Sequence, residues 1–147
     1  MGSSWYIGKI PANIEIVDTI LISGESGFRE GCGLAIFKLS EDTIKKIKTK
    51  GLSALKDARQ ARKYSDHFRV YSEWGETSYQ WTDDGMTLKD RWLLGSMCAN
   101  IDMVLSKDIN AALKSPGSFY ATIHEAGTIV IPNLGIVFFH IMVEKVR

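Results

Sequence analysis

The chain has 147 residues, 45% apolar and 24% charged, with a formal net charge of +1, as expected of one soluble domain with its own core. No apolar run of about 18 residues predicts a membrane span, no signal-peptide pattern opens the chain, and two cysteines are too few for a disulfide framework. We expect one cytoplasmic domain over residues 1–147 with no membrane association, either made without a signal peptide or freed of one.

Two strands are predicted near the amino terminus. Isoleucines recur at near-alternate positions over residues 14–22, a pattern typical of a strand. The glycines and polar residues of 24–27 predict a turn. Residues 28–39, with a largely apolar end, form the second strand candidate.

Two helices are predicted next. Ser40 stands where a helix N-cap is expected, with two acidic residues after it to complement the helix dipole, and Gly51 fits the end of that helix. Ser53 is expected to cap a second helix over residues 54–64, which carries apolar residues at core spacing.

Residues 67–82 predict a β-hairpin. Aromatic and apolar residues alternate with polar ones on both sides of Gly75-Glu76, which suits a two-residue turn. A further turn is expected at residues 83–85, and Thr87 with Asp90 approximates the capping box of another helix.

The last third predicts one helix and three strands. Residues 101–105 fit a strand or a helix, and Ser106 is expected to cap a short helix that ends before Pro116. Apolar runs then predict three strands: Phe119–His124, Thr128–Ile131 and Ile136–Val143. Strands at both ends with helices between them predict an α+β domain, a mostly antiparallel sheet with three or four short helices packed on it.

A thiol site is the first chemical candidate. Cys32 lies between two glycines that would let a ligand approach, and its base would come from one of three histidines: His67, His124 or His140. Cys32 also shares strand parity with Leu34, which favours packing in the core. We expect Cys32 and Cys98 to be buried thiols, with one disulfide between them as the alternative, and we rank a small thiol-dependent enzyme third.

No metal or cofactor site is predicted. His124-Glu125 lacks the second histidine that a helical zinc motif requires, because Thr128 stands at that position. The glycines of residues 24–33 match neither phosphate-binding fingerprint. We expect no metal and no cofactor.

Positive charge is concentrated in one stretch. Residues 38–63 hold nine basic and three acidic residues, a local charge of +6, while the rest of the chain carries −5. Because the local field steers partners, this polarity matters more than the net charge. Lysines of the first predicted helix surround it, as on a solvated helix. On the second, basic residues share a face, so nucleic-acid binding is the second-ranked hypothesis, with four candidate anion-binding residues: Lys56, Arg59, Arg62 and Lys63.

An aromatic and acidic segment follows the basic stretch. Aromatic residues among carboxylates are typical of protein-interface anchors, although alternation assigns about half of these residues to the core. The expected partner-binding residues are Tyr71, Glu73, Trp74, Glu76, Tyr79, Asp83 and Asp84. With no assembled catalytic group, we expect a binding protein rather than an enzyme. Its predicted role is to neutralise a toxin or enzyme by occlusion, as an inhibitor or immunity protein does.

Overall fold

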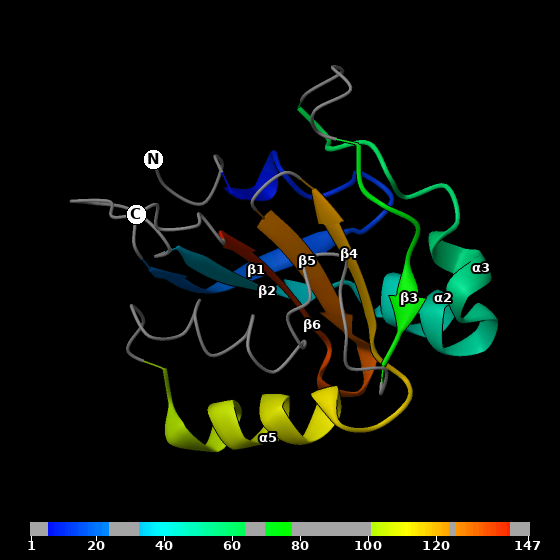
Figure 1. The fold of residues 1–147 in the computed structure, drawn as a ribbon. Helices are drawn as coiled ribbons and strands as arrows, with labels where there is room; N and C mark the ends of the chain where they lie inside the picture. Colours follow the sequence, from blue (N-terminus) through cyan, green and yellow to red (C-terminus); the bar gives the residue numbers. More distant parts are fainter. Residues whose placement is uncertain (1–5, 24–32, 64–69, 78–100, 124–125, 142–147) are drawn as a thin grey trace, which may run out of the picture.

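The centre of the fold is a six-stranded sheet in which every neighbouring pair is antiparallel (Figure 1). The computed structural model describes residues 6–23, 33–63, 70–77, 101–123 and 126–141. The strand order is β1-β2-β6-β5-β4-β3. The strands are β1 (Ile16–Ser23), β2 (Leu34–Leu39), β3 (Gly75–Glu76), β4 (Phe119–Ile123), β5 (Ala126–Ile131) and β6 (Ile136–Ile141).

Helices lie against both faces of this sheet. Ile109 and Leu113 of α5 (Met103–Leu113) pack on one face, and this helix runs below the sheet in Figure 1. Ile47 of α2 (Glu41–Lys50) and Leu55 of α3 (Leu52–Leu55) pack on the other face, together with the segment 6–14. Because both faces are covered, β5 and β6 are buried along their whole length, and their sequences are mostly apolar rather than alternating, with Thr128 and His140 as buried polar residues.

The predicted fold class is confirmed at this level: an antiparallel sheet with a few helices, of the α+β kind. The described residues contain α2, α3, α5 and a 3₁₀ turn, η2 (Pro132–Leu134). Among them, no helix is long and apolar enough to cross a membrane.

The strands lie close to their predicted places. β1 begins two residues later than expected, and β5 begins at Ala126, two residues earlier than expected. The predicted start of the second strand, residues 28–32, lies outside the described residues, and so do the ends of the fourth and sixth strands.

The first helix ends as the sequence predicts. Ser40 Oγ accepts a hydrogen bond of 3.1 Å from the Thr43 amide, which confirms the N-cap. Gly51 follows the helix at φ 60° and ψ −135°, where a side chain is disfavoured, and its amide donates to the carbonyl of Ile47.

The predicted second helix, residues 54–64, is wrong. Only Leu52–Leu55 are helical, and Ser53 lies inside that turn rather than before it. A longer helix would join the Arg62 amide to the Ala58 carbonyl. Instead, the Arg62 amide donates to Ile10, and the Ala58 carbonyl accepts from Trp74 Nε1.

The next amide and carbonyl that a helix would join are also bonded to other segments. The Lys63 amide donates to the carbonyl of Gly8, and the Arg59 carbonyl accepts from the amide of Tyr71. Backbone groups satisfied by distant segments have no need of a helix. The residues after α3 therefore run as an irregular segment between residues 8–11 and 70–74.

The predicted hairpin turn is wrong as well. Gly75 and Glu76 form β3 and pair with Tyr120 and Phe119 of β4. A Cβ atom on Gly75 would lie 2.7 Å from the Tyr120 ring, so the glycine permits close packing of two strands rather than a turn. Residues 78–82, the predicted return strand, lie outside the described residues.

The cap of α5 also differs from the prediction. Asp102, not Ser106, precedes the helix, and its Oδ2 accepts a hydrogen bond of 3.0 Å from the Leu105 amide. Ser106 lies in the first turn instead. Of the ambiguous residues 101–105, the last three therefore begin a helix, which ends before Pro116 as predicted.

Candidate functional site

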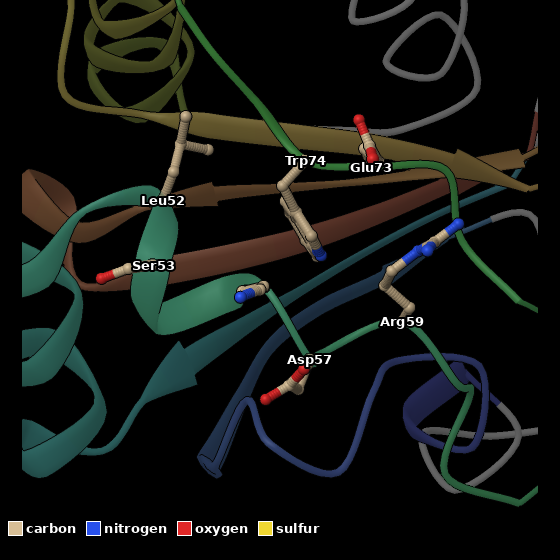
Figure 2. Close-up of a pocket in the computed structure, with 7 residues that line it drawn as sticks. Leu52, Ser53, Asp57, Arg59, Glu73 and Trp74 are labelled. Atoms are coloured by element: carbon tan, nitrogen blue, oxygen red, sulfur yellow. The ribbon is translucent and has the colours of Figure 1, made fainter.

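A pocket of about 470 Å³, which we call the Trp74 pocket, opens between α3 and the segment 71–74 (Figure 2). Its walls are a helical turn, the irregular segment that follows, and the chain leading into β3. The lining residues are Leu52, Ser53, Lys56, Asp57, Arg59, Glu73 and Trp74. Two of the hydrogen bonds that interrupt the predicted helix also hold the pocket walls together, from Trp74 Nε1 to the Ala58 carbonyl and from the Tyr71 amide to the Arg59 carbonyl.

Trp74 forms the floor of the pocket. Its side chain is 8% exposed, and its Nε1 donates a hydrogen bond of 2.8 Å to the carbonyl of Ala58. Figure 2 shows the ring pointing from the 71–74 segment into the space beside α3. The other face of the ring is stacked on Tyr71, with centroids 6.2 Å apart and planes 19° apart. The ring is therefore held rigidly, with little of it open to solvent.

Tyr71 belongs to the core rather than to a binding surface. It is fully buried, its hydroxyl donates to the carbonyl of Lys9 at 2.8 Å, and it shares a 2.7 Å hydrogen bond with the Thr128 hydroxyl. Burial raises the pKa of Tyr71 above its ordinary value, while the bond to Thr128 lowers it slightly. Its expected role as a direct contact residue does not fit this position.

Arg59 closes one side of the pocket. Its Nε donates a hydrogen bond of 2.7 Å to the Tyr71 carbonyl, and the Tyr71 amide donates back to the Arg59 carbonyl at 2.6 Å. These two bonds fasten the segment after α3 to the segment that carries Trp74. Arg59 is thus a structural clamp as well as a charged wall.

The remaining walls are exposed and carry both signs of charge. Lys56, Asp57 and Glu73 are exposed, and Leu52 is 41% exposed although it is apolar. Within the described part of the chain, the charged side chains around the pocket form no ion pair with one another. The pocket therefore offers an apolar floor and rim with unpaired charges around them.

The four predicted anion-binding residues do not share a face. Arg62 Nη2 donates to the carbonyls of Pro11 and Ile14, at 3.1 and 2.6 Å, and burial lowers its pKa. Lys63 packs its stem beside Gly8. Only Lys56 and Arg59 reach the pocket, so the helical face that motivated an anion site is absent.

Of the predicted partner-binding residues, the structure brings Glu73 and Trp74 to the pocket. Glu76 is exposed, but its Oε2 accepts a hydrogen bond of 3.0 Å from the Gly117 amide. The others lie outside the described residues: Tyr79, Asp83 and Asp84.

Sequence reasoning missed the wall formed by α3. Leu52, Ser53 and Asp57 were assigned no part in a site, and Lys56 and Arg59 were assigned to a different site. One signal was present in the sequence, because Leu52 directly follows Gly51 and falls outside the apolar positions of the predicted helix. Glu73 and Trp74 were predicted as binding residues, but nothing in the sequence indicated that α3 would form the opposite wall.

The other chemical candidates are described only in part. Cys32, Cys98, His67 and His124 lie outside the described residues. His140 is a buried strand residue of β6, with its ring 5.9 Å from that of Phe138.

In the ranges that the structure describes, no three His, Cys, Asp or Glu side chains gather as metal ligands would. Comparison of the chain with family models, curated proteins and solved structures finds no match.

Proposed function

We propose that this protein binds another protein by accepting an apolar side chain of it in the Trp74 pocket, and that it neutralises this partner by occlusion. The observation that carries the proposal is an exposed leucine at the rim of a pocket floored by a nearly buried tryptophan. Protein interfaces concentrate binding energy in such apolar, aromatic-floored pockets, surrounded by polar groups that exclude water.

The rigidity of the pocket supports the same proposal. Trp74 is fixed by its bond to Ala58 and Arg59 by its bonds to Tyr71, so neither group has to be ordered when a partner arrives. A site that is ordered in advance loses less conformational entropy on binding. Mixed charges at Lys56, Asp57 and Glu73 supply the polar surround and select among partners.

Nucleic-acid binding receives less support. Arg59 directs its Nε to the Tyr71 carbonyl, and Arg62 directs Nη2 to two more carbonyls. Base stacking requires an exposed aromatic face, and Trp74 exposes only 8% of its surface. A thiol enzyme at Cys32 stays a prediction that the described residues do not address.

The test begins with affinity capture from the native lysate, followed by calorimetric titration of the purified partner. Leu52→Asp places a charge at the rim and is expected to weaken binding by about tenfold or more, with an unchanged free energy of unfolding. The matched control is Met103→Asp on α5, where an equally apolar residue is 76% exposed on the other side of the sheet.

Equal affinity of wild type and Leu52→Asp would remove the pocket from the proposal. Occlusion is tested separately, by assaying the partner's own activity with increasing amounts of this protein. Activity should fall to zero at the stoichiometric ratio. A partner that stays fully active in the complex would contradict neutralisation while leaving binding intact.

A further inference from the structure

We infer that the partner segment that enters the Trp74 pocket is acidic, an inference that rests on the proposed function and names the chemistry of its partner. The occupant is a protein segment with an apolar side chain for the pocket and several carboxylates beside it. Lys50 and Lys56 border the pocket on the side of α2 and α3.

These lysines outnumber the carboxylates of α2, which are Glu41 and Asp42 in its first turn. Residues 45–56 contain five lysines and neither Asp nor Glu, and all five lysine side chains are exposed. We call this set the α2–α3 lysines: Lys45, Lys46, Lys48, Lys50 and Lys56. In the part of the chain that the structure describes, none of them forms an ion pair.

Two of the α2–α3 lysines adjoin the pocket, Lys56 and Lys50, whereas Lys45 and Lys48 line a separate hollow with Glu41 and Asp42. Lys56 lines it directly. Ser53, another lining residue, donates a hydrogen bond of 3.0 Å to the carbonyl of Lys50, so the end of α2 meets the pocket at this point. A segment that fills the pocket and continues toward α2 passes over positive charge.

Helix stability explains only part of this charge. Lys48 and Lys50 lie in the last turn of α2, where cations complement the helix dipole. Lys45 and Lys46 lie in the middle of the helix, where the dipole does not account for them, and Lys56 follows a helix of only four residues, whose dipole is small. Their positive field is available for steering and selecting a partner of opposite charge.

The acidic residues that line the pocket indicate on which side of it the carboxylates of the partner lie. Asp57 and Glu73 also line the pocket, so the pocket itself is close to neutral, whereas on α2 four lysines exceed two carboxylates. The carboxylates of the partner are therefore expected to lie toward Lys50. Glu73 repels them from the opposite side.

A random dodecapeptide library displayed on phage tests this inference with the intact protein. Panning at low salt is expected to enrich peptides that combine a net negative charge with a large apolar residue. The affinity of the enriched peptides is then measured by fluorescence anisotropy. It should fall about tenfold or more for the double variant Lys50→Glu/Lys56→Glu, because two attractive contacts become repulsive.

The matched control is Lys107→Glu/Lys114→Glu, which makes the same change in net charge at exposed positions of α5 and just after it. It is expected to leave affinity within about twofold. A fluorescent oligothymidylate is titrated in parallel as a polyanion without an apolar side chain, and it should bind at least about tenfold more weakly than the selected peptides.

Several results would overturn the inference. Enrichment of neutral or basic peptides that depend on Leu52 would leave the proposed pocket in place and remove only the acidic character of its partner. Absence of any enrichment, or equal loss of affinity in the control variant, would remove the acidic segment as the occupant. Oligothymidylate binding as tight as peptide binding would assign the lysines to nucleic acid instead.

Discussion

The indole nitrogen of Trp74 donates a hydrogen bond of 2.8 Å to the main-chain carbonyl of Ala58, sixteen residues earlier in the chain. In a continuous helix, that carbonyl would accept from the amide of Arg62, which here donates to Ile10. The contact therefore belongs both to the floor of the pocket and to the interruption of the predicted helix. Loss of the indole N–H should affect stability and binding together.

Trp74→Phe is expected to lower the free energy of unfolding by about 1–3 kcal/mol, because the Ala58 carbonyl loses its partner in a buried place. Trp74→Ala should cost about 3–5 kcal/mol, since it also empties a buried volume. Urea unfolding followed by far-ultraviolet circular dichroism measures both values. Equal stability of Trp74→Phe and wild type would show that the hydrogen bond contributes nothing net.

Tyr71 predicts a loss of stability at alkaline pH. Burial raises its pKa in the folded state, so the folded protein holds the phenol proton to higher pH than the unfolded chain does. The stabilisation is fully present below the ordinary tyrosine pKa of about 10 and is lost as the pH rises above it, by at most about 1.4 kcal/mol per pH unit. Urea titrations between about pH 8 and about pH 11 measure the slope.

Tyr71→Phe is the control for that slope, since other tyrosines titrate in both proteins. The variant should be less stable at neutral pH by about 1–3 kcal/mol, because the Thr128 hydroxyl and the Lys9 carbonyl lose a partner. Its stability should depend less on pH above about pH 10. Identical alkaline slopes in the two proteins would mean that Tyr71 is not the residue responsible.

Gly51→Ala tests the junction of α2 and α3. No atom lies within 4 Å of the added Cβ, so the cost comes from the backbone alone, at φ 60° and ψ −135°. We expect a loss of about 1–3 kcal/mol of unfolding free energy. Thr49→Ala, an exposed change two residues earlier within α2, should alter stability by less than about 0.5 kcal/mol. An unchanged free energy of unfolding in Gly51→Ala would contradict backbone strain at the positive φ of this residue.

The cap of α5 gives a paired comparison. Asp102→Ala is expected to cost about 1 kcal/mol, because the Leu105 amide loses its acceptor. Ser106→Ala should be neutral or slightly stabilising, because alanine is the better helix former within the first turn. Thermal unfolding of the two single variants decides between them, and the reverse order would restore Ser106 as the cap.

Only part of the pocket could be predicted from the sequence. Glu73 and Trp74 were predicted as recognition residues and do line the pocket, but Tyr71 from the same segment is core. Alternation does not hold there, because residues 71–74 belong to no strand: Tyr71 and Glu73 share strand parity, yet Tyr71 is buried and Glu73 is exposed. The segments that bury Tyr71 come from residues 9 and 128, far away in the chain.

Local chemistry was enough wherever a residue acts on its near neighbours. The Ser40 cap, the glycine that ends α2 and the apolar strands of the sheet all follow from the amino-acid sequence alone. Those features depend on hydrogen bonds and side-chain periods within a few residues. The α+β class follows from them too.

Only the tertiary structure decided what happens after Leu55. Residues 56–63 have helical spacing and no proline or glycine, so nothing local ends the helix. Four backbone groups of that segment bond instead to Gly8, Ile10, Tyr71 and Trp74. A helix depends on i to i+4 bonds that each add little net free energy, so distant partners that also bury Tyr71 and Trp74 outweigh them. The Trp74 pocket exists because of that outcome.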